Sequence, residues 1–186
     1  ILRPESRTNG RQDVDYVLTT EELIGMIQSY GLTLNGADKD AADMPFGITS
    51  GAGLIFGASG GVTEAVLRNF LAGHNRQEID ELKRVGVREE NGIREFTFHH
   101  GDREIHAAVV SGLRNADMVL NAIREGGKNY DFVEFMACPG GCIMGGGQHV
   151  SSHGNMFRAR RDSLYETDIN MQIKKTSENP LLDTLY

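Results

Sequence analysis

The chain has 186 residues, with 19 lysines and arginines against 26 aspartates and glutamates, and a formal net charge of −7. This balance argues against a nucleic-acid binder with a broad basic surface, and no apolar run approaches the roughly 18 residues of a membrane span. The two cysteines exclude a disulfide-stapled secreted scaffold and any site that needs four thiolates from this chain alone.

The N-terminal part predicts a strand followed by a helix. Residues 15–18 are β-prone, and Thr19 with Glu22 has the spacing of a capping box. Apolar residues then recur at helical spacing until Gly31, a residue type that favours a helix C-terminus. The polar stretch with glycine and proline at 35–49 predicts a long loop.

The middle of the chain predicts a second strand-to-helix unit and a hairpin. Residues 54–56 lead as a strand into the glycine-rich turn 57–61. Residues 94–99 and 105–110 predict a β-hairpin that turns at Gly101 and Asp102. The helix after the glycine-rich turn has an apolar side made of Val62, Val66, Leu67, Phe70 and Leu71.

The last predicted units are a helix and a strand. An apolar stripe of Leu113, Ala116, Leu120 and Ile123 ends at two glycines, and residues 130–136 form a strand. Strands separated by helices indicate an α/β fold, with a mostly parallel sheet, flanking helices and an antiparallel hairpin. We expect one domain fragment over residues 1–186, and we expect both ends to lie inside a longer protein.

The residues that carry chemistry follow the last strand. Cys138 and Cys142 lie where ligands collect in α/β proteins, at the carboxyl end of a strand. If the chain turns helical after Pro139, the two thiols lie on one face and suit neighbouring atoms of a metal cluster. Nearby glycines allow close backbone approach and leave amides to hydrogen-bond sulfur. Cysteines are also common as small buried apolar residues, but five glycines beside two thiols favour a site.

This segment carries a resemblance to a known family. The third cysteine signature of the iron-only (di-iron) hydrogenases resembles Met136-Ala137-Cys138-Pro139-Gly140-Gly141-Cys142 with Gly145-Gly146-Gly147-Gln148. Further similarities follow in the family's order, at residues 13–23, at the glycine-rich turn 50–65, and in the C-terminal helical segments 158–165 and 177–180. The resemblance implies one half of the hydrogenase catalytic domain (the H-cluster domain of the large subunit), namely its C-terminal part.

The resemblance also implies an activity, a cofactor and site residues. The activity is the reversible oxidation of dihydrogen to protons and electrons at an H-cluster, a 4Fe-4S cubane joined to a di-iron subcluster. Cys142 would bridge the two parts, Cys138 would ligate the cubane, and Met136 would face the di-iron unit. Phe56 and Gly57 would lie at the pocket wall. The implied partners are dihydrogen and ferredoxin or a similar electron carrier, with the cytoplasm as the location and the periplasm as the alternative.

The departures from the family pattern are equally informative. In the family, the other two cubane cysteines, a proton-relay cysteine and a cyanide-binding lysine lie upstream of the segment where this chain begins. We therefore expect the N-terminal half of the catalytic domain as a partner, and we expect this chain alone to lack the cluster and to be inactive. In the isolated chain, Cys138 and Cys142 are expected to be free thiols or to carry an adventitious metal. His149 stands where the family usually has proline.

Other interpretations stay open. Cys138, Cys142, His149 and His153 have the ligand types and outer spacings of a Cys₂His₂ zinc site. A non-catalytic relative, similar to hydrogenase-like proteins of iron–sulfur assembly or sensing, shares the third signature. The glycines at 51–57 only superficially resemble a dinucleotide fingerprint, because the spacing differs. The start of the following helix suits a negative ligand, such as a cluster's cyanides. We expect the remaining histidines to lie at the surface or on edge strands: His74, His99, His100 and His106.

Overall fold

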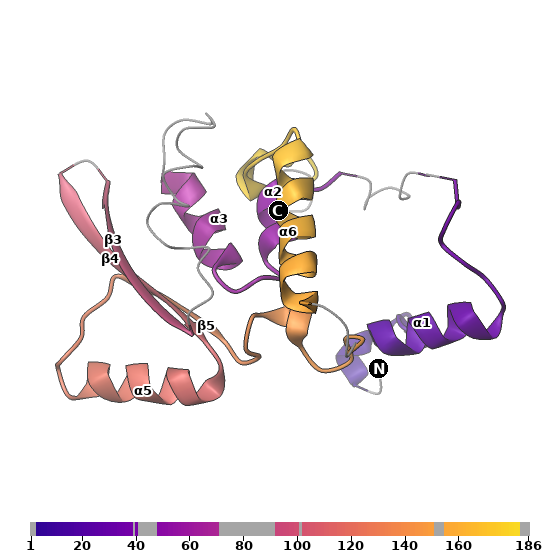
Figure 1. The fold of residues 1–186 in the computed structure, drawn as a ribbon, viewed down its shortest axis with the longest axis horizontal. Coiled ribbons are helices and arrows are strands. Elements are labelled where there is room, and N and C mark those ends of the chain that lie inside the picture. The colour runs from indigo at the N-terminus through magenta and orange to yellow at the C-terminus, as the bar shows by residue number, and fades with distance from the viewer. Residues whose placement is uncertain are drawn as a thin grey trace. The chain divides into compact units, whose positions relative to one another are not determined.

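The computed structural model describes residues 3–38, 40, 48–70, 92–100, 102–150 and 155–182 (Figure 1). The chain divides into two compact units. The first consists of residues 1–39 and 147–150, and the second of residues 40–146 and 151–186. Among the described residues, no helix combines the length and the apolar character needed to cross a bilayer.

The first unit is built from short elements and one helix. The 3-10 helix η1 (Pro4–Ser6) precedes the antiparallel pair β1 (Arg7–Thr8) and β2 (Arg11–Gln12), and α1 spans Thr20–Ser29. Residues 15–18 form no strand, so that prediction is wrong. These side chains are exposed, and a β-prone run becomes a strand only where a neighbour pairs its backbone groups.

The predicted ends of α1 are confirmed. The Thr19 hydroxyl accepts a hydrogen bond from the Glu22 amide at 3.2 Å, and the Glu22 carboxylate accepts one from the Thr19 amide at 2.7 Å. This bond from the Thr19 backbone lowers the pKa of Glu22. At the other end, the Gly31 amide donates to the Gln28 carbonyl at 2.9 Å. Local sequence signals therefore suffice to define this helix.

The second unit contains a three-stranded sheet in the order β3-β4-β5. Its strands are β3 (Ile93–His100), β4 (Arg103–Ser111) and β5 (Phe132–Met136). The β3–β4 pair is antiparallel and confirms the predicted hairpin, although Gly101 lies outside the described residues. The β4–β5 pair is parallel. The described sheet is therefore mixed rather than mostly parallel, because the hairpin supplies one of its two pairings.

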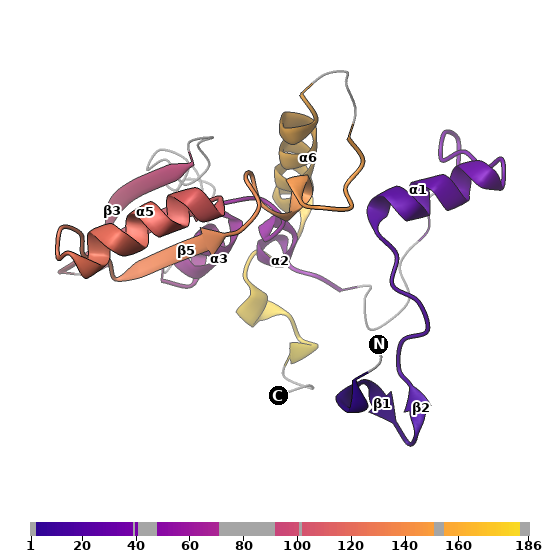
Figure 2. The same ribbon diagram turned by 90° about the horizontal axis from the view of Figure 1, so that it is seen from below.

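Two helices cover opposite faces of this sheet (Figures 1 and 2). Side chains alternate along β4, so Val109 packs with Leu67 of α3 (Gly61–Phe70), whereas Val110 packs with Val119 of α5 (Leu113–Arg124). Both helices confirm the prediction, with Leu71 outside the described residues. The predicted stripe of α5 is only partly its core side, because Leu113 is 70% exposed.

The segment before α3 is helical, so the predicted strand at 54–56 is wrong. Helix α2 spans Gly51–Ile55, and the Ser50 side chain caps it by accepting from the Gly53 amide at 3.2 Å. Helix α2 packs on α6 (Met156–Asn170) so closely that a Cβ at Gly51 would lie 2.0 Å from Oδ1 of Asp168. The chain after α6 forms η3 (Thr176–Glu178). Burial against α6 thus outweighs the β-propensity of this apolar run.

Candidate metal centre

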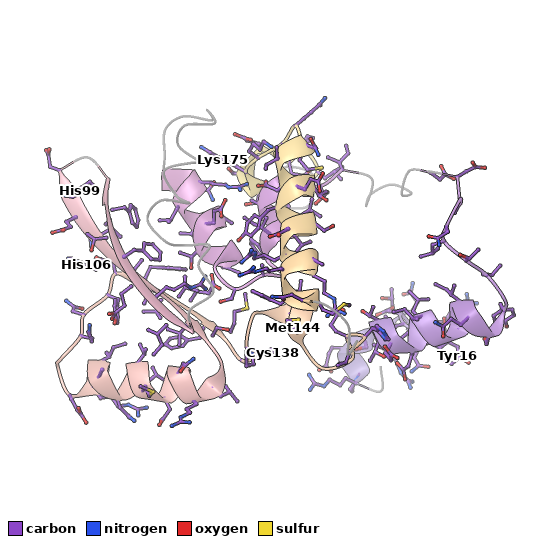
Figure 3. All side chains as sticks on the ribbon, viewed as in Figure 1. Tyr16, His99, His106, Cys138, Met144 and Lys175 are labelled. Carbon is purple, nitrogen blue, oxygen red and sulfur yellow. The ribbon has the colours of Figure 1, made fainter. Side chains whose placement is uncertain are left out.

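The two cysteines follow β5 in a tight turn. The Cys138 carbonyl accepts a hydrogen bond from the Gly141 amide at 3.0 Å, and the 3-10 helix η2 then spans Cys142–Met144. Cys138 is half-buried and Cys142 is exposed. Figure 3 shows Cys138 and Met144 at the N-terminal end of α6. One thiol is therefore sheltered and the other is accessible.

The structure does not form the helix that would place both thiols on one face. Gly140 and Gly141 have φ values of +85° and +94°, a left-handed conformation that glycine adopts without steric cost. The turn that they make separates the two cysteines into different local structures. The i and i+4 helical geometry considered from the sequence is therefore wrong for this segment.

The loop before α3 holds the cysteine segment through its backbone. The Ser59 amide donates to the Gly140 carbonyl at 3.2 Å, and the Ile143 amide donates to the Gly57 carbonyl at 3.0 Å. A Cβ at Gly141 would lie 2.6 Å from the Ser59 nitrogen. The two segments therefore touch main chain to main chain, which explains why the signature needs glycine at this position.

The end of β4 supports the same turn from another side. The Gly140 amide donates to the Ser111 hydroxyl at 2.7 Å, and the Gly112 amide donates to the Met136 carbonyl at 2.7 Å. Ser111 is 7% exposed, so its hydroxyl accepts this bond away from solvent. Buried backbone amides need such partners. Ser111 thus fixes the turn between Met136 and Cys142.

The hydrogen-bond acceptors of the glycine amides differ from those that the sequence predicts. The amides of Gly140, Gly141 and Gly145 donate to oxygen atoms, the last of them to the Cys142 carbonyl at 3.0 Å. The expectation that they hydrogen-bond sulfur is therefore wrong for these three. Space beside the thiols differs along the run: a Cβ at Gly145 would lie 3.2 Å from the Cys142 carbonyl oxygen and 3.5 Å from Sγ of Cys138, whereas one at Gly146 would meet nothing within 4 Å.

The structure brings Gly57 beside the cysteine segment. A Cβ at Gly57 would lie 3.3 Å from Cγ2 of Ile143, and its carbonyl binds the Ile143 amide. Phe56 is 42% exposed and adjoins Gly57 in the chain. Met136 is half-buried at the end of β5, two residues before Cys138. The roles expected for these residues stay predictions.

The N-terminus of α3 already holds an anion, which is a side chain of this protein. The Glu134 carboxylate accepts from the Gly60 amide at 2.7 Å and from both the amide and the hydroxyl of Thr63, each at 2.7 Å. Glu134 is 5% exposed. The suggestion that an external negative ligand occupies this helix end is therefore wrong.

Helix α6 contributes a cation to the cysteine segment. Nη1 of Arg160 donates to the Ile143 carbonyl at 2.8 Å and lies 3.8 Å from the Met144 sulfur. The residue after Cys142 is thus held by Gly57 through its amide and by Arg160 through its carbonyl. The sequence analysis missed Arg160, for which the basic run at the start of α6 is the available signal.

A buried ion network joins α3 to α6. The Arg68 guanidinium binds both carboxylate oxygens of Asp168, at 2.8 and 2.7 Å, and one oxygen of Glu64 at 2.5 Å. The three side chains are at most 3% exposed. Burial alone lowers the pKa of Arg68, but the hydrogen bonds and charges of Asp168 and Glu64 outweigh it and raise this pKa. The network therefore keeps its charges inside the core.

Sequence reasoning missed Glu134, Arg68 and Asp168, although two weak signals exist. Glu134 interrupts an apolar strand, and Glu64 with Arg68 has the i and i+4 spacing of a helical ion pair. The partners of Glu134 and Asp168 lie 71 and 100 residues away, respectively. No local pattern identifies such partners.

Of the two histidines in the zinc alternative, the structure describes His149. His149 belongs to the first unit, where its Nδ1 lies 2.7 Å from the Glu21 carboxylate, and His153 lies outside the described residues. Within the described ranges, no three side chains of His, Cys, Asp or Glu gather as metal ligands would. The Cys₂His₂ hypothesis stays a prediction.

The expectation for the other histidines is confirmed where the structure describes them. His99 and His106 are exposed on the β3–β4 hairpin, away from Cys138 (Figure 3). His74 and the side chain of His100 lie outside the described residues.

Comparison with known proteins identifies the family. Residues 1–146 match the family described as iron only hydrogenase large subunit, C-terminal domain. The chain is 36% identical to the NADP-reducing hydrogenase subunit HndD of Solidesulfovibrio fructosivorans, over 99% of this chain and 32% of that protein. The chain therefore belongs to the iron-only hydrogenase large-subunit family, as the cysteine signature predicted.

A solved structure shows the same fold. The FeFe hydrogenase HydA1 of Chlamydomonas reinhardtii matches with a TM-score of 0.67 and 28% identity, over 99% of this chain and 54% of that chain. The α/β prediction and its assignment to half of a hydrogenase catalytic domain are thereby confirmed.

The chain is also similar to a relative that is not named as a hydrogenase. A cytosolic Fe-S cluster assembly factor of Xenopus tropicalis, narfl, is 32% identical over 84% of this chain and 34% of that protein. The chain thus spans about a third of the length of these curated relatives.

Proposed function

We propose that this chain supplies two of the thiolates that hold the iron–sulfur cluster of an iron-only hydrogenase, which oxidises dihydrogen reversibly. The observation that supports this most is the cysteine turn after β5, where backbone bonds from the Gly57–Ser59 loop to Gly140 and Ile143 hold the segment that carries Cys138 and Cys142. Two soft thiolates are half of the four that a cubane usually takes. The residues present therefore fit one side of such a cluster.

The chain's own residues have distinct tasks in this proposal. Cys138, which is half-buried, would be a ligand of the cubane, and the exposed Cys142 would be the thiolate shared with the di-iron unit. Met136 would face that unit with its thioether, and Phe56 with Gly57 would form one wall of the pocket. When bound, the H-cluster supplies the redox chemistry of the hydrogen–hydrogen bond.

The remaining ligands come from a partner segment in this proposal. The N-terminal half of the catalytic domain supplies two further cubane cysteines, the relay cysteine and the cyanide-binding lysine. Ferredoxin or a similar carrier exchanges electrons with the assembled protein, in the cytoplasm or, alternatively, the periplasm. The 186-residue chain alone neither assembles the cluster nor turns over dihydrogen.

The test compares the chain with and without that partner segment. Both forms are expressed with the maturation machinery, and we measure hydrogen evolution and the infrared bands of CO and cyanide. Activity and bands are expected only with the partner, and Cys142→Ala is expected to abolish both. Bands or hydrogen evolution from the 186-residue chain alone would contradict the proposed division of ligands. Their absence from the assembled form would contradict the hydrogenase function.

A second candidate is a non-catalytic iron–sulfur assembly protein. The match to narfl over 84% of the chain supports it, because that relative is named for cluster assembly. Both candidates use Cys138 and Cys142 as ligands. A relay cysteine and a cyanide-facing lysine in the sequence upstream of Ile1 would indicate the enzyme. Other residue types at those two positions would indicate the assembly protein.

A further inference from the structure

We infer that Glu134 is a positioning residue, which acts through the loop before α3 to hold the cysteine turn in its geometry. The inference deepens the proposed function, and its catalytic meaning rests on it. Glu134 itself contacts neither cysteine in the bonds described above. Its carboxylate binds the amides of Gly60 and Thr63 and the Thr63 hydroxyl.

Hydrogen bonds and the loop's own backbone connect Glu134 to Gly140 and Ile143, which lie beside the cysteines in the chain. Glu134 holds Gly60 at one end of the loop, and the loop's Ser59 and Gly57 bind the turn at Gly140 and Ile143. The strand that carries Glu134 runs into Cys138 two residues after its end. Strand, loop and turn therefore form a closed ring, in which Glu134 is the link between strand and loop.

The sheet register places Glu134 on the correct face for this task. Glu134 pairs with Val109, which in turn pairs with Arg94 across the sheet. Val109 packs against α3, and paired residues point to the same face. Arg94, 5% exposed, donates to the Ser59 hydroxyl at 2.7 Å. Two buried charged residues on this face therefore hold the same loop.

The chemistry of the contact requires a carboxylate. Three donors converge on Glu134, and a carboxylate offers two oxygens that only accept. Glutamine has nearly the same shape but presents an NH₂ group to at least one of these donors. A leucine or alanine would leave two amides unpaired inside the protein. A helix cap needs only one such acceptor, so the excess of bonds points to positioning.

The test measures the geometry of the turn in the metal-free 186-residue chain. Iodoacetamide modifies each thiol at a rate that mass spectrometry resolves for Cys138 and Cys142 separately. Glu134→Gln is expected to raise the Cys138 rate about tenfold relative to the Cys142 rate, because breaking bonds to a buried charged group loosens the turn. Thr63→Val removes only the hydroxyl bond and is expected to raise the same ratio about threefold.

The matched control is Val119→Ala, which creates a cavity on the opposite face of the sheet. Val119 belongs to α5, is 5% exposed and packs against Ala108 and Val110 of the sheet, so its truncation destabilises the unit without touching the loop. The thiol-rate ratio is expected to stay unchanged in this variant. An equal change in Val119→Ala and Glu134→Gln, or no change in Glu134→Gln, would overturn the inference.

Two features keep this test decisive. If Glu134→Gln does not fold, Thr63→Val carries the test alone, and an unchanged ratio in that variant overturns the inference. Because the measurement needs no cluster, a failure of the proposed hydrogenase function leaves its result intact. Conversely, if the assembled enzyme is active and the thiol-rate ratio is unchanged in both variants, the positioning role of Glu134 is rejected and the proposed hydrogenase function is retained.

Discussion

The Glu134 carboxylate lies 2.7 Å from both the amide and the hydroxyl of Thr63, a residue 71 positions earlier in the chain. This contact is polar and buried, and it joins residues that are far apart in the chain. The same carboxylate also binds the Gly60 amide, in the loop that holds the cysteine turn. A second buried network, around Arg68, ties the same helix α3 to α6. The candidate site is thus framed by charged side chains whose partners lie in other elements.

The Arg68 network is expected to be essential for stability. Arg68→Met removes the guanidinium that binds the buried carboxylates of Glu64 and Asp168, so the free energy of unfolding should fall by about 3–5 kcal/mol. Urea denaturation followed by circular dichroism measures this change. The matched control is Arg103→Met, which breaks an arginine–aspartate pair with Asp131 whose arginine is 72% exposed. That loss should stay below about 1 kcal/mol, and equal losses in the two variants would contradict the prediction.

Substitution by alanine is expected to lower the stability at one glycine of the cysteine segment and to leave it almost unchanged at another. In Gly141→Ala, the new Cβ would lie 2.6 Å from the Ser59 nitrogen on a backbone with φ +94°, so the loop and turn must separate. We expect a loss of about 2 kcal/mol or more in the free energy of unfolding. In Gly146→Ala, nothing lies within 4 Å, and stability should change by less than about 0.5 kcal/mol. A tolerated Gly141→Ala would mean that the two segments are not in backbone contact.

The buried Ser111 hydroxyl is expected to contribute more to the free energy of unfolding than an exposed hydroxyl does. Ser111→Ala leaves the Gly140 amide without its acceptor, which should cost about 1–3 kcal/mol in the free energy of unfolding. Thermal unfolding of the variant measures the loss. As a control, Thr167→Ala removes an exposed hydroxyl that donates to a carbonyl of its own helix, and no loss is expected. A neutral Ser111→Ala would show that solvent replaces the lost bond.

Tyr130 is expected to titrate abnormally. Burial raises the pKa of Tyr130 to about 12, with further contributions from the hydrogen bond to Glu95 and the charge of Glu95. The same bond lowers the pKa of Glu95. Glu95→Gln should therefore bring the Tyr130 pKa down toward its ordinary value near 10, without reaching it, because burial remains. Tyrosinate absorbance, taken as the difference from Tyr130→Phe, follows this titration.

The sign of the effect on stability follows from the raised pKa. The unfolded chain releases the Tyr130 proton near pH 10, whereas the folded chain keeps it to about pH 12. The contribution of Tyr130 is therefore complete below pH 10 and disappears as the pH rises to about 12. An unchanged tyrosine titration in Glu95→Gln would contradict the role of Glu95.

Much of the fold could be predicted because its signals are local. The capping box of Thr19 and Glu22 and the alternation of β3 and β4 lie within a few residues of the elements that they define. The errors fall where tertiary contacts decide. Residues 54–56 are apolar enough for a strand, but packing against α6 selects a helix. Residues 15–18 have the composition of a strand and no paired neighbour in the described structure.

The residues of the candidate site also fall into two groups, those that the sequence could identify and those that depend on tertiary structure. Cys138, Cys142 and their glycines stand in one contiguous motif, so the sequence could identify them. Ser111 and Arg160 bind that motif from β4 and α6, and Glu134 binds the loop that holds the motif, through Gly60. Hydrogen bonds between residues so distant in the chain depend on the sheet register and on helix packing, which residue spacing does not contain.

The row formed by Arg94, Val109 and Glu134 also has a consequence for how the sheet assembles. Because side chains alternate along a strand, a slip of one residue in β3 or in β5 would turn the charged side chain of that strand to the face covered by α5. There Glu134 would lie among apolar side chains such as Val110, and the amides of Gly60 and Thr63 would lose their acceptor. One-residue slips in either strand pairing are therefore penalised before any cofactor binds.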